Sequence, residues 1–301
     1  MQNQPVLKDH EWSILKLLNW TASYFKSHDI DSPRTTAEIL LAHTLKLKRI
    51  DLYINYDKPL GRHELADFKV LIQRRINKEP VAYIVGNKEF WSLNLAVTKD
   101  VLIPRPDTEC IVEAGLGLLT EDYASTPMRV FELGTGSGAI ILALASERPG
   151  HVFFASDRSI KAIEPAQKNA KRHNLGGLIN FFFSDWFSAL ADNVHPFDII
   201  ISNPPYIPTR DIQRLQPEIY RHEPLMALDG GKDGLVHLTH IIRNAHLYLK
   251  QGGYLLLEIG YDQKSRVRNI IDACGEYEEV MFIKDYAGHN RVVRMMKKRV
   301  R

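Results

Sequence analysis

From about residue 128 onward, short apolar segments alternate with longer amphipathic ones, and this alternation constrains the fold more than any other feature of the chain. Strand-like segments occur at 128–133, 151–157, 179–185, 197–203 and 252–260, and helical spacing occurs at 137–147, 159–174, 233–250 and 263–274. Strands that alternate with helices form parallel sheets covered on both faces. We therefore predict an α/β domain with a doubly wound, mostly parallel sheet. Residues 278–298 predict a final antiparallel pair of strands joined by a glycine-containing turn.

The first 75 or so residues have a different character, because apolar residues recur there at helical spacing and no strand pattern interrupts them. Three helices are expected within 11–28, 32–45 and 61–77. The pattern changes at Pro80, where β-rich runs around Gly86-Asn87 predict a hairpin. We place a small N-terminal helical domain at 1–78, a β-hairpin and linker at 79–110, and the α/β domain at 111–301.

Composition and charge narrow the class of protein. A hydrophobic fraction of 45% and a charged fraction of 25% are ordinary for a soluble globular chain, and a net charge of +3 gives no strong affinity for polyanions. The two cysteines, Cys110 and Cys274, lie far apart and outside any C-x-x-C pair, which favours a reducing compartment over a disulfide framework. No segment has the length of a membrane span or the pattern of a signal peptide. We expect a cytoplasmic protein without a metal site.

A glycine-rich turn follows the first strand of the α/β region. Residues Gly134, Thr135, Gly136, Ser137 and Gly138 stand between a strand and a helix. Glycines let the backbone approach a ligand closely and take positive φ values, and the N–H groups of the following helix face the same crevice. This predicts a nucleotide-type binding turn. The alternative is a tight strand–helix connection without a ligand.

Acidic and aromatic residues end the next two strands. Asp157 lies about 20 residues past the glycines, where an acid accepts hydrogen bonds from ribose hydroxyls. A helix N-cap is the alternative for Asp157, because Ser159 and a helix follow it. Asp185 can accept from an exocyclic amine, and the Trp186 indole can lie flat on a purine. Core packing is the alternative for Trp186.

The fourth strand runs into Asn203-Pro204-Pro205-Tyr206, which selects between two kinds of cofactor. The glycines have G-x-G-x-G spacing instead of the dinucleotide spacing G-x-G-x-x-G, which favours S-adenosylmethionine. A planar NH₂ group that attacks a methyl group must free its lone pair. The side-chain oxygen of Asn203 and the carbonyl of Pro204 can accept its two hydrogens, Pro205 helps to fix the turn, and Tyr206 can pack on the flat group. A proline strand terminator without a role is the alternative.

Six segments of the chain, in this order, resemble blocks of the release factor glutamine methyltransferase family. They are "EPVAYIVGNKEFWSLNLAVTKDVLIPRPDTE", "ELGTGSGAI", "SDWF", "SNPPYIP", "HEPLMALDGGKDGL" and "KDYAGHNRVV". Together they cover roughly residues 79 to 293, and the helical N-terminal region is similar in kind. The Asn-Pro-Pro-Tyr turn alone would also fit adenine-N6 DNA methyltransferases. The linker block and the "DYAGHNR" ending are what resemble the glutamine family.

The resemblance implies a Rossmann-like class I methyltransferase domain with a seven-stranded, mostly parallel sheet. It implies that Gly134 to Gly138, Asp157, Trp186 and Asn203 contact S-adenosylmethionine, and that the loop from Asn203 to Tyr206 holds the substrate glutamine. That glutamine would lie in the Gly-Gly-Gln motif of class-1 peptide chain release factors. One departure is Glu132, where the family more often has Asp.

Other expectations follow from this reading of the chain. The helical domain would help to dock the protein substrate, and we expect a monomer without a membrane or direct nucleic-acid partner. The alternatives are glutamine methylation of a ribosomal protein, adenine-N6 methylation of nucleic acid, and a non-catalytic release-factor or RNA-binding module.

Overall fold

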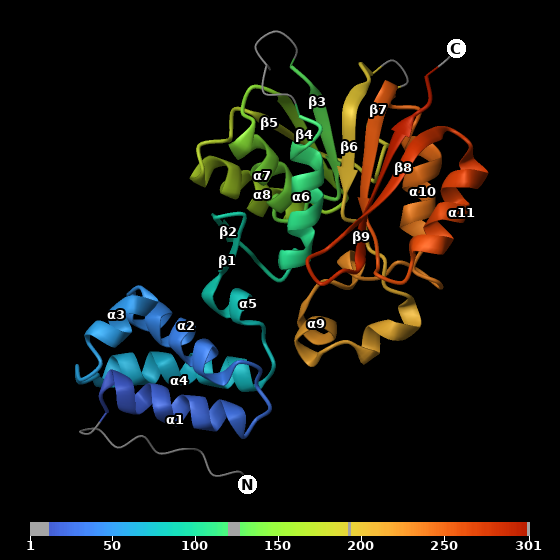
Figure 1. Cartoon of the computed structure of the whole chain (residues 1–301). Helices are drawn as coiled ribbons and strands as arrows, with labels where there is room; N and C mark the ends of the chain where they lie inside the picture. The colour runs from blue at the N-terminus through green and yellow to red at the C-terminus, as the bar shows by residue number, and fades with distance from the viewer. Residues whose placement is uncertain (1–11, 120–126, 192–193, 300–301) are drawn as a thin grey trace. The chain divides into compact units, whose positions relative to one another are not determined.

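The structure, a computed structural model, describes residues 12–119, 127–191 and 194–299, which form two compact units (Figure 1). One unit comprises the chain up to Gly86 together with Pro217–His222, and the other comprises Asn87–Gln216 and the chain from Glu223 onward. The domain boundaries predicted after residues 78 and 110 remain predictions. The N-terminal segment examined for a signal peptide lies mostly outside the described residues.

The first unit is helical. Its helices are α1 (Ile14–Lys26), α2 (Pro33–Leu45), α3 (Arg49–Ile54), α4 (Arg62–Ile76), α5 (Val81–Val85) and α9 (Pro217–His222). The three predicted helices, α1, α2 and α4, are confirmed, and their apolar faces meet in a core that includes Leu17, Leu41 and Phe68. Helix α3 is six residues long, too short for its spacing to have shown.

The hairpin prediction was wrong in the position of its turn. Strands β1 (Asn87–Phe90) and β2 (Leu93–Ala96) pair antiparallel, and the turn is Trp91-Ser92, where φ is 51° and 59°. Two positive φ angles are the geometry of a tight two-residue hairpin turn. Gly86, with φ of 77°, instead ends helix α5, so the apolar run before it is helical and not a strand.

The second unit contains a seven-stranded sheet in the order β5-β4-β3-β6-β7-β9-β8. The strands are β3 (Arg129–Leu133), β4 (Val152–Asp157), β5 (Ile179–Phe183), β6 (Phe197–Ser202), β7 (Leu249–Glu258), β8 (Tyr277–Lys284) and β9 (Asn290–Lys297). Pairing is parallel from β5 to β7, and β9 pairs antiparallel with β7 and β8. The doubly wound sheet and its final antiparallel pair are therefore confirmed.

Helices cover both faces of this sheet (Figure 1). They are α6 (Glu109–Leu116), α7 (Ala139–Glu147) and α8 (Ile160–Arg172) on one face, and α10 (Val236–Ala245) and α11 (Lys264–Cys274) on the other. Successive strand residues enter opposite cores: Ile199 and Ile201 pack under α6 and α7, whereas Ile200 packs under α10. No helix among the described residues combines the length and apolar character needed to cross a membrane.

The strand order places a crevice at the carboxyl ends of β3 and β6. The chain runs from β3 outward to β4 and β5, then returns to the other side of β3 as β6. Open parallel sheets bind ligands at such a reversal of strand order. Leu133 is paired with Ser202, and the Ser202 hydroxyl donates to the Leu133 carbonyl at 2.7 Å. Gly134 and Asn203, the next residue of each strand, therefore enter the crevice at the same level.

Candidate active site

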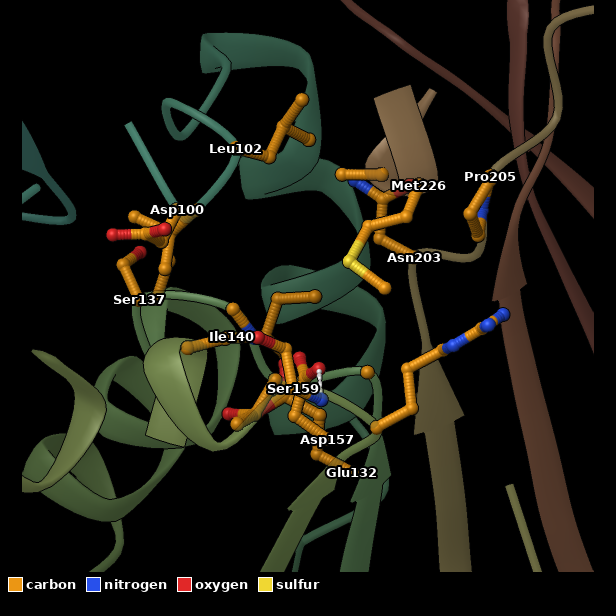
Figure 2. A pocket seen from close by; sticks show the side chains of 18 of the residues that line it. Asp100, Leu102, Glu132, Ser137, Ile140, Asp157, Ser159, Asn203, Pro205 and Met226 are labelled. Atoms are coloured by element: carbon orange, nitrogen blue, oxygen red, sulfur yellow. Dashed lines mark hydrogen bonds between the residues drawn. The ribbon is translucent and has the colours of Figure 1, made fainter. Parts of the chain in front are cut away.

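A cavity opens at these strand ends and encloses about 970 Å³, counting the part open to solvent. All its lining residues belong to the second unit. They come from the loop 100–108, from the turns after β3, β4, β5 and β6, and from Met226, Ala227 and His237. Figure 2 shows Glu132 and Asp157 on one side of the cavity and Asn203, Pro205 and Met226 on another.

The glycine turn divides into residues that face the cavity and one that does not. Gly134, Thr135, Gly136 and Ser137 line the cavity, and Gly138 lies outside the lining. The φ angles of Gly134, Gly136 and Gly138 are 71°, 55° and 84°, all in the region that favours glycine. A Cβ on Gly138 would lie 3.0 Å from Leu142 and 3.3 Å from Ala166 of α8. Gly138 is therefore needed for helix packing as well as for the turn.

The Asp157 carboxylate holds the glycine turn against the end of β4. Its Oδ2 accepts from the Gly136 amide at 3.0 Å, and its Oδ1 accepts from the Ser159 amide at 2.9 Å. Ser159, not Asp157, is the N-cap residue of α8. Each carboxylate oxygen accepts at least two hydrogen bonds, so Asp157 can still receive hydroxyl donors from the cavity.

Asp185 and Trp186 line the cavity beside His237 of α10. The Trp186 ring lies 5.3 Å from the His237 ring, centroid to centroid, at an angle of 44°. Trp186 also packs against the core under α10, so part of its ring fulfils the core role that the sequence left open. Asp185 is exposed, with its backbone amide fixed by the Ser188 hydroxyl.

Glu132 is a buried acid at the base of the cavity. Its side chain is 1% exposed and its Oε2 accepts from the Thr135 hydroxyl at 2.6 Å. Burial raises the pKa of Glu132 to about 8, and the hydrogen bond from Thr135 opposes that rise. A cation placed in the cavity would favour the ionised form, so this acid suits a positively charged ligand.

The Asn203-Pro204-Pro205-Tyr206 turn contributes Asn203 and Pro205 to the cavity lining, whereas Pro204 and Tyr206 lie outside it. The Asn203 Nδ2 donates to the Thr108 Oγ1 at 3.3 Å. Because the amide nitrogen is used in this way, the side-chain oxygen is left to accept from a ligand. The Tyr206 hydroxyl donates to the Glu258 Oε1 at 3.2 Å.

A glycine-rich segment packs directly on the backbone of this turn. The Ile207 amide donates to the Leu228 carbonyl at 3.1 Å, and the Gly230 amide donates to the Ile207 carbonyl at 2.8 Å. A Cβ on Gly230 would lie 2.8 Å from the backbone of Tyr206, and one on Gly234 would lie 2.4 Å from the Tyr206 carbonyl oxygen. Side chains at these two positions would therefore push the turn away from its place.

Glu223 connects two walls of the cavity. Its carboxylate forms an ion pair with Arg105, and it accepts from the Ile103 amide at 3.2 Å. Arg105 lines the cavity from one side, and Met226, three residues after Glu223, lines it from another. The Glu223 side chain is 1% exposed and that of Arg105 is 35% exposed, so the carboxylate of the pair is shielded from solvent.

Sequence reasoning missed several residues of this region, among them Thr108, Glu223, His237 and Glu258. Thr108 and Glu223 lie inside the quoted blocks "EPVAYIVGNKEFWSLNLAVTKDVLIPRPDTE" and "HEPLMALDGGKDGL", which could have drawn attention to them. His237 packs beside Trp186 and lines the cavity, and no motif of the sequence marks it. Glu258 ends an apolar strand, and an acid at that place is a signal like the one used for Asp157.

Solved structures share this fold. The catalytic domain of hMettl16 matches with a TM-score of 0.55 and 17% identity, over 70% of this chain and 77% of that one. A methyltransferase from Pyrococcus furiosus matches with a TM-score of 0.50 and 21% identity, over 78% of this chain and 99% of that one. Fold, glycine turn and strand-end acids together define a class I methyltransferase domain, whose methyl donor is S-adenosylmethionine.

Sequence relatives narrow this class to one family. Residues 16–86 match the model "PrmC N-terminal domain", and residues 111–221 match "Methyltransferase small domain". Release factor glutamine methyltransferases of Geobacter sulfurreducens, Coxiella burnetii and Escherichia coli K12 are 41%, 44% and 42% identical to this chain. The matches cover 95%, 87% and 87% of this chain and 97%, 91% and 91% of those proteins. The chain belongs to the release factor glutamine methyltransferase family.

Proposed function

We propose that this protein transfers a methyl group from S-adenosylmethionine to the side-chain amide nitrogen of the glutamine in the Gly-Gly-Gln motif of class-1 peptide chain release factors. The observation that carries the proposal is the turn Asn203-Pro204-Pro205-Tyr206, here called the Asn203 turn, at the wall of the cavity. The chain that contains it is 41–44% identical to release factor glutamine methyltransferases. We place the reaction in the cytoplasm. We also propose that it acts as a monomer.

The cavity residues fit S-adenosylmethionine by their chemistry. Gly134 and Gly136 have no side chain where the turn meets the cavity, and a Cβ on Gly136 would find no atom within 4 Å, so a ligand can approach closely there. Asp157 has acceptor capacity for ribose hydroxyls, Asp185 for an exocyclic amine, and Trp186 offers an aromatic surface. Glu132 and Asp157 favour a cation. Bound here, S-adenosylmethionine supplies an electrophilic methyl group on a positively charged sulfur.

The chain's own residues orient the target amide. The Asn203 oxygen and the Pro204 carbonyl each accept one hydrogen of the glutamine NH₂, which turns the nitrogen lone pair out of conjugation with its carbonyl. Leu102, Pro205 and Met226 form an apolar wall for the aliphatic part of the side chain (Figure 2). Catalysis then depends on positioning and on preorganised acceptors, and needs no metal and no covalent intermediate on the protein.

Methyl transfer to defined substrates tests this function. The purified protein is incubated with methyl-labelled S-adenosylmethionine and a class-1 release factor, and the modified residue is mapped by mass spectrometry. Label on the Gly-Gly-Gln glutamine, and its absence when that glutamine is replaced by alanine, would support the proposal. Ribosomal proteins and adenine-containing DNA and RNA are assayed in parallel. Efficient labelling of any of these, with the release factor unlabelled, would overturn it.

A further inference from the structure

Asn203 and Tyr206, the first and last residues of the Asn203 turn, are both connected to one buried carboxylate. This carboxylate belongs to Glu258, which does not line the cavity. Asn203 donates to Thr108 at 3.3 Å, and the Thr108 side chain lies close enough to Glu258 to lower the pKa of that acid. Tyr206, at the other end of the turn, donates to the Glu258 Oε1 at 3.2 Å. The first of these two connections runs from Asn203 through Thr108 to Glu258. Asn203 lies 95 positions after Thr108 in the sequence, and Glu258 lies 150 positions after it. We call Asn203, Thr108, Glu258 and Tyr206 the Glu258 network.

The sheet fixes the position of Glu258. Strand β7 lies beside β6, and Leu257 is paired with Ser202, so Glu258 stands level with Asn203. On its other side Glu258 is paired with Val292 of β9. Its side chain is 1% exposed. A carboxylate at the end of a central strand, held by pairing on both sides, has little freedom to move.

The charges around Glu258 do not explain why a carboxylate is kept there. Arg291 of β9 is the nearby cation, and its Nη2 is already paired with Asp107 at 2.9 Å and with Asp285 at 3.2 Å. Within the described part of the chain, Glu258 makes no ion pair, and its Oε2 has no hydrogen-bond partner. A buried carboxylate in this situation costs stability. The Tyr206 hydroxyl donates to Glu258 and the Thr108 side chain lowers its pKa, and both residues lead to the Asn203 turn.

We propose that Glu258 is a positioning residue, which through the Thr108 and Tyr206 hydroxyls holds the Asn203 amide and the Tyr206 ring in the orientation that the glutamine substrate needs. The inference rests on the proposed function and adds to it a residue outside the substrate cavity. An ionised carboxylate accepts from both hydroxyls at once. A protonated carboxyl is a weaker acceptor for these hydroxyls, and its proton adds a donor at Oε2, which has no hydrogen-bond partner among the described residues.

Ionisation of Glu258 therefore affects the geometry of the turn. Burial raises the pKa of Glu258 to about 7, and Asp107 raises it further, whereas Thr108, Arg291 and Tyr206 lower it. The other charged groups near the network are Arg105, which faces Tyr206, and Asp285, which pairs with Arg291. Glu132 lines the same cavity as Asn203 and has a pKa of about 8.

A nuclear magnetic resonance titration of the free, full-length protein tests the network without any turnover. The side-chain amide signal of Asn203 is assigned in ¹⁵N-labelled protein by its loss in Asn203→Ala. We expect this signal to shift with pH with a midpoint near 7, the pKa of Glu258. In Glu258→Gln this step should vanish, and only a step near 8 from Glu132 should remain. A signal that titrates in the same way in both proteins would overturn the proposal.

Single-turnover kinetics supply the second measurement. A glutamine at position 258 is neutral and therefore a weaker acceptor for the hydroxyls than a carboxylate, so Glu258→Gln should lower the rate of release factor methylation by about 10–100-fold, the usual cost of losing a residue that orients a functional group. The Kd for S-adenosylmethionine should not rise and the Tm should not fall, because a neutral side chain of the same shape replaces an unpaired buried acid. A loss confined to Tm, or an unchanged rate, would assign Glu258 a merely structural role.

Hydroxyl deletions provide the matched comparison. Thr108→Val and Tyr206→Phe each remove one partner of Glu258, and combining them with Glu258→Gln should cost less than the sum of the separate effects. Tyr277→Phe is the control, because the Tyr277 hydroxyl is buried in the same sheet but donates to the Ile242 carbonyl at 2.8 Å, away from the network. Fully additive effects would overturn the proposal. If the wild-type protein labels no release factor, the proposed function is wrong. The nuclear magnetic resonance titration of the free protein still tests the Glu258 network in that case.

Discussion

Asn203 carries both a donor and an acceptor, and the structure uses the donor internally. The sequence predicted only the acceptor role, in which the side-chain oxygen receives a hydrogen of the substrate. The hydrogen bond from the Asn203 Nδ2 to Thr108 adds a second requirement, because it sets the direction of that oxygen. A residue that can accept but cannot donate is therefore insufficient at this position.

We expect Asn203→Ala and Asn203→Asp to be impaired alike. The alanine variant loses the acceptor, and the aspartate variant loses the donor to Thr108 while it brings a negative charge toward Glu258. Loss of one preorganised group in such a site typically costs about 10²–10³ in rate. The measurement is single-turnover methylation at saturating S-adenosylmethionine. An aspartate variant with near-wild-type rate would show that the Thr108 hydrogen bond is dispensable.

Asp157 has a similar double role toward the glycine turn. Asp157→Ala removes the acceptor for the Gly136 and Ser159 amides as well as that for the ribose hydroxyls. We expect affinity for S-adenosylmethionine to fall by about 1–3 kcal/mol, measured by isothermal titration calorimetry. Asp185→Ala serves as a comparison, since Asp185 is exposed and holds no part of the glycine turn, and should cost less. Equal affinity of Asp157→Ala and the wild type would refute the binding role.

At the scale of elements, the segment after α9 keeps the Asn203 turn in place by close backbone contact. The block "HEPLMALDGGKDGL" was quoted in the sequence as a resemblance, but its glycines had no physical explanation there. Gly230 has an ordinary φ angle, so its requirement is steric: a Cβ would meet the Tyr206 backbone at 2.8 Å. Spacing patterns describe one segment at a time and do not show which two loops will touch.

Gly230→Ala should therefore impair both stability and turnover. An added methyl group in a packed contact typically costs about 1–3 kcal/mol, and here the displaced atoms belong to the turn that holds the substrate. Urea unfolding and single-turnover kinetics measure the two effects. Gly177→Ala is the matched control, because a Cβ at Gly177 has no atom within 4 Å and its φ is ordinary. The expectation fails if the two alanine variants behave alike.

At the scale of the whole molecule, the sheet was predictable and the polar contacts across it were not. Each strand and helix of the α/β region has its own hydrophobic period, which is a local property of the sequence. Glu258 and Tyr206 are hydrogen-bonded although 52 positions separate them in the sequence, and Asn203 and Thr108 although 95 positions separate them. A local hydrophobic period does not indicate such pairs. The hairpin turn failed for a related reason, since the short apolar run 81–85 fits a strand and a helix equally well.

The free energy of unfolding should decrease with rising pH through the buried acids. Glu132 and Glu258 have pKa values raised to about 8 and about 7 from an ordinary 4.5. Between pH 4.5 and these values the folded protein binds more protons than the unfolded chain, so each acid lowers stability as the pH increases. Glu38 and Asp285, whose pKa values are lowered, act only at more acidic pH.

Comparison of a variant with the wild type isolates the contribution of one buried acid to the pH dependence of stability, because both proteins share every other ionisable group. The difference in unfolding free energy between Glu132→Gln and the wild type should grow in favour of the variant from about pH 6 to 8, by up to about 1.4 kcal/mol per pH unit, and then level off. Urea unfolding of the two proteins across this range gives the difference directly. A difference that is independent of pH would mean that Glu132 is already ionised in the free protein.

The pairing of Leu133 with Ser202 also determines how this enzyme can be re-engineered. Main-chain hydrogen bonds set the spacing between the two strand ends, and they are indifferent to the amino acids in the loops that follow. The half of the cavity built from Gly134 to Asp157 can therefore be retained while residues within 209–222 are varied, provided that Ile207, Glu223 and Leu228 are kept, because they hold the cavity wall and the Asn203 turn. We expect donor recognition and target choice to be separable in this way, so a library confined to those residues should explore new acceptors while binding of the methyl donor is kept.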